Sequence, residues 1–389
     1  MARGPRPVSR RALLTAAPLF FLTAPLSYCG NRYKDMTAAR QRYAKRGHGP
    51  VVIGAVQQLN DRSGFVNGVK MAAAEINAAG GLLGRHVLLD VTNDGGERLA
   101  VARRNARDLA SDEALLAVIS CESSATAIGT SVTYQYEDVL CLEVSSTSPR
   151  LTAHHFDMVF RTIPNDIQNA KATAAYMEKK GYRKTVIVSD RSVYGLGLSE
   201  LMRKDLDDRA VMQRIYLPDV NTFWELVSEI KGSDFDSVFL VGAPRSAAHL
   251  IKVMRTVGVT VPIVGGDSLD SPLVWSIAGK AAEGLVVPTV FDRESTDPRV
   301  VRFVTDYQSL YLTAPDTRAA KGYGALKLLA TVVASSKRLD PEAVAAVMRF
   351  RQGWKGAFST ISFDAQGDVV GRKIYFQTLR DGIFIPITE

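Results

Sequence analysis

The sequence predicts an α/β protein built from two doubly wound parallel-sheet lobes that are joined by a multi-strand hinge. Apolar runs of strand length alternate with amphipathic helical segments along most of the 389 residues. This alternation is typical of parallel sheets covered by helices on both faces. The chain is too long for one ordinary core, and a second alternating series starts after residue 163. We therefore expect two lobes of similar construction.

The first series begins with an apolar run at 51–58, which we expect to be a strand. A helix over 65–79 follows, because Phe65, Val69 and Ile76 recur at helical spacing. The pair Gly80-Gly81 ends this helix, and a strand over 86–94 and a charged helix over 97–112 come next.

Residues 115–151 contain two further apolar runs, and hydroxyl side chains follow each of them. These residues are Ser120, Ser123, Ser124, Ser145, Ser146 and Thr147. Ligands of open α/β sheets bind at the carboxyl ends of the strands, so we interpret this polar ledge as holding one end of a small molecule. Each serine could instead be a helix N-cap or a turn residue, which is the commoner role.

The second series starts where Asn165 or Asp166 can cap a helix that Gly181 ends. Strands with helices between them are expected at 184–190, 212–218, 236–243, 262–267 and 283–291. Two long helices over 298–312 and 317–339 and β-hairpins over 359–387 complete the chain. These late elements need a place in both lobes, so the chain should cross between lobes more than once, as in a hinged clamshell.

The formal net charge of +8 is concentrated at the N-terminus. Residues 1–48 contain ten Lys and Arg and one Asp, which leaves a net charge of −1 on residues 49–389. Because residues 49–389 are nearly neutral, their charge does not indicate binding to nucleic acid or to an anionic membrane.

Residues 1–29 have the shape of an export signal, with arginines before an uncharged run that Pro18 and Pro25 interrupt. The string SRRALL at 9–14 resembles a twin-arginine export motif. The string at 26–29 resembles a lipoprotein box that would place a lipid on Cys29, although Tyr28 departs from the small residue expected there. An uncleaved anchor is the alternative. Residues 30–49 would then be a flexible basic leader.

No pattern for catalysis or metal binding is present. The sequence lacks HExxH, GxSxG, a phosphate loop and Cys/His metal spacing, so we expect no enzyme activity, no cofactor and no metal. Cys121 and Cys141 fall on strands expected to be adjacent. A bridge between them is conceivable, but two separately buried thiols fit better.

Seven strings occur in the order and at the spacing of a known family. They are GVKMAAAEINAAGGLLGRHVLLDVTND (68–94), SSATA (123–127), EVSSTSPRLT (143–152), VFRTIPND (159–166), VIVSDRSVYGLGL (186–198), AAEGLVVPTVF (281–291) and STISFDAQGDV (359–369). Their order and spacing match over nearly all of residues 50–387, and together they resemble the type I periplasmic solute-binding proteins of ABC transporters, specifically the branched-chain amino-acid (Leu/Ile/Val) binding group.

The resemblance implies that a ligand lies between lobe 1 (50–163 and 285–337) and lobe 2 (164–284 and 338–389). Ser124 and Thr147 would give hydroxyls to the ligand's α-carboxylate, beside Ser123. Ser145 and Ser146 would offer backbone groups to the carboxylate and the ammonium.

From the facing lobe, the resemblance implies that Tyr194 closes over the ligand and that Asp267 pairs with its ammonium. The loop at 57–65 departs from the family pattern, which makes Asn60 and Asp61 pocket candidates. Ala243 stands where an aromatic residue is frequent, which suggests a roomier pocket.

By this resemblance the chain should be an exported, monomeric protein of the periplasm or cell surface that delivers a small zwitterion to an ABC permease. It should meet the membrane only through a lipid anchor and should bind no nucleic acid. Two alternatives stay open: a ligand-sensing receptor domain of the same fold, and a binder of short amides, urea or carboxylates.

Overall fold

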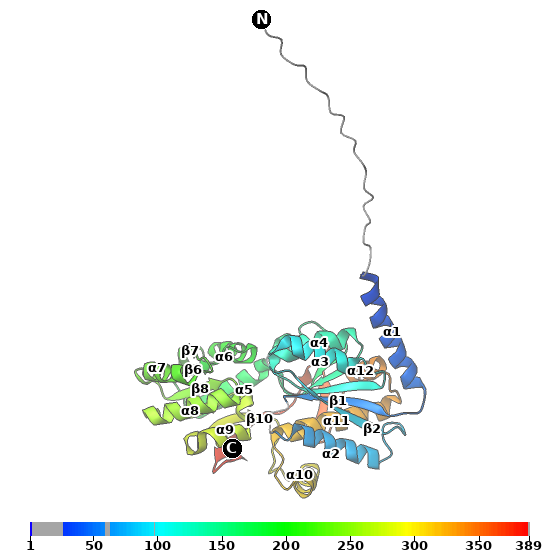
Figure 1. Ribbon diagram of the computed structural model, residues 1–389. Coiled ribbons are helices and arrows are strands. Elements are labelled where there is room, and N and C mark those ends of the chain that lie inside the picture. The colour runs from blue at the N-terminus through cyan, green and yellow to red at the C-terminus, as the bar shows by residue number, and fades with distance from the viewer. Residues whose placement is uncertain (2–25, 59–62, 97, 388–389) are drawn as a thin grey trace.

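In the computed structural model, the chain forms the two α/β lobes that the sequence predicts (Figure 1). The structure describes Met1 and residues 26–58, 63–96 and 98–387, with the side chains of 26–34 left out. Lobe 1 is built on a five-stranded parallel sheet in the order β2-β1-β3-β4-β5. Its strands are β1 (Val51–Gln57), β2 (Val87–Asn93), β3 (Leu115–Cys121), β4 (Leu140–Glu143) and β5 (Val159–Arg161).

Helices cover both faces of the lobe 1 sheet. On one face lie α3 (Leu99–Ala110) and α4 (Ser124–Tyr136), and on the other lie α2 (Phe65–Ala78), α10 (Pro298–Tyr311), α11 (Thr317–Ser336) and α12 (Pro341–Phe350). A Cβ at Gly68 of α2 would lie 2.0 Å from the carbonyl oxygen of Ala319 in α11. Only glycine therefore allows these two helices to approach so closely.

Lobe 2 has a seven-stranded sheet in the order β15-β14-β10-β9-β8-β6-β7. Five strands run parallel: β6 (Thr185–Ser189), β7 (Ala210–Ile215), β8 (Ser237–Val241), β9 (Ile263–Gly265) and β10 (Val286–Thr289). The antiparallel strands β14 (Tyr375–Arg380) and β15 (Ile383–Pro386) complete it. Its helices are α5 (Asp166–Lys179), α6 (Val193–Leu206), α7 (Val220–Lys231), α8 (Pro244–Val257) and α9 (Pro272–Ala278).

Short 3₁₀ turns join several elements, namely η1 (Pro149–Leu151), η2 (Asp207–Arg209), η3 (Asp267–Leu269) and η4 (Gly279–Ala282). Cys121 and Cys141 are both buried, as the sequence favours. They are not cross-strand neighbours, because Cys141 pairs with Val118 in the register of β3 and β4, three residues before Cys121.

In the part of the chain that the structure describes, three crossings join the lobes, and two of them differ from the boundaries expected from the sequence. The sequence predicts that β10 belongs to lobe 1, but the strand pairs with β9 and β14 and so belongs to lobe 2. The segment after residue 337 was assigned to lobe 2. Instead α12 and the small sheet of β11 (Trp354–Lys355), β12 (Thr360–Phe363) and β13 (Val369–Val370) pack on lobe 1.

The physical reason is burial. Trp354, Ile361 and Phe363 fill the core beneath α11 and α12, where each is at most 4% exposed. The crossings accordingly follow β5, β10 and β13. Hairpin patterns fit either lobe, so the order of residues alone does not indicate this placement.

The segment expected to be a flexible leader is a helix, α1 (Leu26–Lys45), whose second half docks on lobe 1 at the side away from lobe 2 (Figure 1). Arg40 is 2% exposed and donates to the carbonyl oxygens of Ala110, at 2.6 Å, and Glu137. The Tyr43 hydroxyl donates to the carbonyl of Pro50 at 2.9 Å. These contacts order the helix, so the expectation of a flexible leader over 30–49 was wrong.

The expected signal region up to residue 25 lies outside the described residues, and so does the side chain of Cys29, whose backbone belongs to α1. Among the described helices, none is long and apolar enough to cross a membrane.

Candidate functional site

The predicted ledge forms where β3 and β4 end side by side. Their register pairs Ser120 with Glu143, so the loops that follow both strands meet at one edge of the sheet. Ser123 is the N-cap of α4, and its Oγ accepts from the Thr126 amide at 3.3 Å. The capping alternative thus applies to Ser123. Ser124, the first residue of α4, is 4% exposed, and its hydroxyl makes no hydrogen bond within the described part of the chain.

The backbone amides of Ser145 and Ser146 are already engaged. Both donate to Oε1 of Glu143, at 2.7 and 2.8 Å. Both N–H groups therefore already have a partner, because the preceding carboxylate folds back onto them. The hydroxyls behave differently: those of Ser146 and Thr147 are buried and have no hydrogen-bond partner among the described atoms.

On the facing lobe, Tyr194 and Asp267 form one unit. The Tyr194 hydroxyl donates to Oδ1 of Asp267 at 2.9 Å and accepts from the Ser268 amide at 3.3 Å. Burial raises the pKa of Tyr194 well above its usual value, and the Asp267 charge raises it further. A Cβ at Gly266 would lie 2.3 Å from this hydroxyl, so the glycine before Asp267 makes room for the pair.

Ala243 precedes α8, and its amide donates to Oδ2 of Asp190 at 2.8 Å. The residue is exposed and carries only a methyl group. Asn60 and Asp61 lie outside the described residues.

The sequence reasoning treated Asp166 only as a candidate cap and missed its position. Asn165 takes the capping role with Gln168, which leaves Asp166 at the first turn of α5. Asp166 is 0% exposed, and both carboxylate oxygens lack a hydrogen-bond partner among the described atoms. Its amide donates to the carbonyl of Thr147 at 2.8 Å. A lone buried carboxylate at the ledge is a site for a cation or a proton.

Electrostatics support that interpretation of Asp166. Burial raises its pKa to about 7. The Thr147 hydroxyl, which lies near the carboxylate without meeting hydrogen-bond geometry, opposes this shift, Asp267 adds to it, and Arg161 opposes it. Asp166 therefore lies within electrostatic reach of both halves of the predicted site, the ledge and the Tyr194–Asp267 unit. The family string at 159–166 offers two adjacent acceptors for one N-cap, Asn165 and Asp166. The one that does not cap the helix could have been recognised as a candidate site residue.

Behind the ledge lies a second pair of buried acids that the sequence analysis also missed. Oε2 of Glu122 accepts from the hydroxyls of Ser120 and Thr130, each at 2.8 Å, while its Oε1 has no partner among the described atoms. Burial, and then the charge of Glu143, raises the pKa of Glu122 to about 8. Burial also raises the pKa of Glu143 to about 7, against the hydrogen bonds that it accepts.

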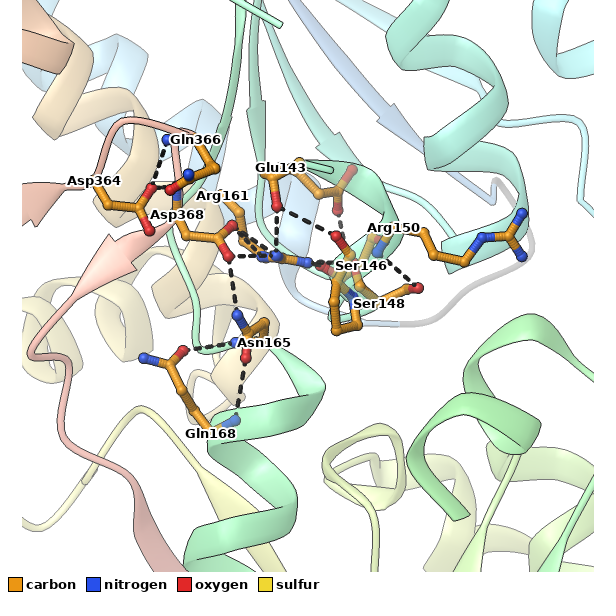
Figure 2. Close-up of polar contacts among 12 residues, drawn as sticks. Glu143, Ser146, Ser148, Arg150, Arg161, Asn165, Gln168, Asp364, Gln366 and Asp368 are labelled. Carbon is orange, nitrogen blue, oxygen red and sulfur yellow. Dashed lines mark hydrogen bonds and ion pairs between the residues drawn. The ribbon is translucent and has the colours of Figure 1, made fainter. Parts of the chain in front are cut away.

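Arg161 holds the ledge loop in place (Figure 2). Its guanidinium is fully buried and donates to the carbonyl of Ser148 at 2.6 Å and to the hydroxyl of Thr152 at 3.0 Å. Asp368, from the turn before β13, pairs with Arg161 and also accepts from Asn165 at 2.9 Å. The network joins the ledge loop, the start of α5 and a distant part of lobe 1.

A recess at the hinge opens beside Asp267. It is lined by Ile163, Pro164, Asn169, Asp267, Asp270, Pro288, Thr289, Val290 and Lys321. The ledge and this recess offer hydrogen-bond donors and acceptors. No group of His, Cys, Asp and Glu in the described chain could hold a metal ion. The arrangement is suited to binding: hydroxyls at the start of α4 can hold an anion with the helix dipole behind them, and Asp166 and Asp267 can hold a cation.

A family model described as periplasmic binding protein matches residues 54–382. The chain belongs to the periplasmic binding protein family. This confirms the predicted family and the two-lobed fold, and the family consists of substrate-binding proteins rather than enzymes.

Relatives and solved structures agree with this membership. The chain is 26% identical to the Leu/Ile/Val-binding protein BraC3 of Rhizobium johnstonii over 87% of this chain and 95% of that one. It is 25% identical to a leucine-, isoleucine-, valine-, threonine-, and alanine-binding protein of Pseudomonas aeruginosa over 82% and 85%. An ABC transporter substrate-binding protein of Desulfitobacterium hafniense, solved with Leu, superposes with a TM-score of 0.78 at 27% identity and covers 87% of this chain and 100% of its own.

Proposed function

We propose that this periplasmic binding protein captures an amino-acid zwitterion between its two lobes. The proposal rests on one observation: groups suited to an anion and a group suited to a cation both lie at the interlobe site. Unpartnered hydroxyl donors lie on the ledge, and an unpartnered buried carboxylate, Asp166, lies where α5 begins. A zwitterion satisfies both at once, because its carboxylate and ammonium are separated by one carbon atom.

In this proposal the carboxylate binds at Ser124 and Thr147, beside the N-terminus of α4. The ammonium binds between Asp166 and the Tyr194–Asp267 unit. The names of the relatives, which cite leucine, isoleucine and valine, support an aliphatic side chain. Ala243, with no bulk at its position, leaves space on the lobe 2 side, and the loop at Asn60 and Asp61 would complete the pocket. Ser123, Ser145 and Ser146 would then support the ledge rather than contact the ligand through backbone amides.

We further propose that the protein is exported and delivers its ligand to an ABC permease. The names of the solved relatives support the transporter partner, and the arginine-rich start of the chain supports export. Cys29 would be the lipid attachment site. Labelling of cells with a fatty-acid analogue tests this point: incorporation should be lost in Cys29→Ser, and equal incorporation would contradict it.

A thermal-shift panel of amino acids, short amides, urea and plain carboxylates tests the ligand class. A ligand at a hundred times its dissociation constant stabilises the folded state by about 2.7 kcal/mol. We expect the largest rise in melting temperature with an aliphatic amino acid. A rise with an amide or a plain carboxylate, and none with any zwitterion, would contradict the proposal.

A further inference from the structure

A second recess at the hinge is lined by two cationic side chains and by no carboxylate. It lies where the first and third crossings pass α11 and the loop between β11 and β12. Its lining consists of Thr162, Ala320, Lys321, Gly324, Ala325, Leu328, Ala357, Phe358, Ser359, Ile361 and Arg372. Two positive charges in a partly buried site that no carboxylate lines are costly.

Arg372 lies on the third crossing, between β13 and β14. Its Nη1 donates to the carbonyl oxygen of Thr162 at 3.0 Å, which is its only hydrogen bond within the described ranges. No described carboxylate lies within ion-pair distance of it. Burial lowers the pKa of the guanidinium to about 10, as expected for a desolvated cation without an anionic partner.

Lys321 reaches the same recess from α11 and also lines the recess beside Asp267. It forms no ion pair in the part of the chain that the structure describes. Its charge opposes the burial-driven rise in the pKa of Asp270, so Lys321 is partly compensated from the neighbouring recess. Arg372 has no such compensation.

Residue 324, which lines the recess with both cations, is a glycine and contributes no side chain to it. A Cβ at Gly324 would meet the Phe358 ring at 3.8 Å, which is ordinary van der Waals contact. The backbone there is helical, within α11, so a side chain would be tolerated. Position 324 follows Lys321 by three residues in α11, so a carboxylate there would lie on the same face of the helix as Lys321, beside the recess.

We propose that this recess binds a small oxyanion, of the carboxylate or phosphate class, between Lys321 and Arg372. An oxyanion can accept two parallel hydrogen bonds from the planar guanidinium and can form an ion pair with the ammonium. Lys321 belongs to lobe 1 and Arg372 to the crossing that enters lobe 2, so the anion ties the third crossing to lobe 1. This site is separate from the zwitterion site, and it does not depend on the ligand proposed there.

Thermal unfolding of the whole protein in inorganic phosphate, and separately in acetate, at constant ionic strength tests this inference. We expect at least one of them to raise the melting temperature of the unaltered protein, by about 3 °C at a hundredfold excess over its dissociation constant. The response should disappear in Lys321→Met/Arg372→Met. No response of the unaltered protein to either anion would overturn the proposal.

The matched pair Gly324→Asp and Gly324→Asn keeps the test decisive even if the double variant fails to fold. The Asp variant supplies its own carboxylate, so it should melt at a higher temperature than the Asn variant and should lose the response to the anion. The Asn variant has the same size without the charge and should retain the response. An equal response in both variants would mean that the anion acts elsewhere.

Discussion

The guanidinium of Arg161 and the carboxylate of Asp368 form a forked ion pair between segments that are 207 residues apart in the sequence. Nη2 of Arg161 lies 2.6 and 2.8 Å from the two carboxylate oxygens, and Nε lies 3.0 Å from Oδ1. Arg161 ends β5, at the first crossing, and Asp368 precedes the third crossing. The pair therefore fixes two of the three hinge segments and the ledge loop relative to one another.

Replacing Arg161 with Met should lower the free energy of unfolding by about 3–5 kcal/mol, because removing one partner of a buried pair leaves the other charge uncompensated. Urea unfolding measures the loss. The exposed pair Arg203–Glu200 is the control: Arg203→Met should change stability by less than about 1 kcal/mol. Equal effects of the two substitutions would refute the role given to Arg161.

Removing the ledge hydroxyls should weaken ligand binding and leave the fold intact. We expect Ser124→Ala and Thr147→Val each to raise the dissociation constant by about tenfold or more, since each removes a hydrogen bond to a charged group. Calorimetric titration with the amino acid selected by the thermal-shift panel measures the change. Ser309→Ala, at an exposed position of α10, should bind as the unaltered protein does. Full affinity in both ledge variants would rule out the ledge as the carboxylate site.

Affinity for the amino acid should fall as the pH drops below about 7. The pKa of Asp166 is raised to about 7 in the free protein, so at lower pH this carboxyl is protonated. Binding of an ammonium then requires the release of that proton, which opposes binding. Titration in buffers of different ionisation enthalpy would detect this release. Asp166→Asn should bind more weakly at pH 8 and lose this pH dependence, whereas an unchanged profile would show that Asp166 does not face the ammonium.

The raised pKa of Glu122 predicts a second effect of pH, on the free energy of unfolding. Its pKa is raised in the folded state from 4.5 to about 8, so the folded protein holds this proton more tightly than the unfolded chain does. The resulting stability is fully present below about pH 4.5 and is lost as the pH rises towards 8.

Chemical unfolding at pH 6 and pH 8 checks this effect, and Glu122→Gln should be the more stable variant at pH 8, with a smaller decrease between the two values. Glu225→Gln, at an exposed position of α7, is the control. A decrease of the same size in Glu122→Gln and in the unaltered protein would contradict the prediction.

Docking of α1 depends on Arg40. We expect Arg40→Ala to destabilise the helix over residues 35–45 by about 2–3 kcal/mol, because two buried carbonyl oxygens lose a charged donor. Hydrogen exchange of these amides should become faster while the core of β1 and β3 stays protected. Arg42→Ala, on the same helix, is the comparison. No change in exchange would mean that other contacts hold α1.

The sequence predicted the alternation of strands and helices well because burial on a parallel sheet imposes long apolar runs. It also predicted where the ledge lies, since hydroxyls after neighbouring strands must meet at one sheet edge. It failed where long-range contacts decide the outcome. Nothing in the basic, polar segment before residue 46 shows that Arg40 will find two carbonyl oxygens on lobe 1, about 70 and 97 residues away.

The same limit applies to the site residues. The local string VFRTIPND permits either Asn165 or Asp166 to cap α5, and only the structure shows that Asn165 does so and leaves Asp166 buried without a partner. Likewise, Glu143 removes the Ser145 and Ser146 amides from the ledge. A side chain that folds back onto its own loop has no periodic signature in the sequence.

The most direct test of the proposed zwitterion site compares one ligand with its two halves. The amino acid that gives the largest thermal shift is titrated by calorimetry beside the amine that lacks its carboxylate and the acid that lacks its ammonium. If the ledge and Asp166 act together, only the intact amino acid should bind, with each truncated compound weaker by about a hundredfold or more. Binding of either truncated compound as tightly as the amino acid, or no binding of any amino acid, would contradict the account.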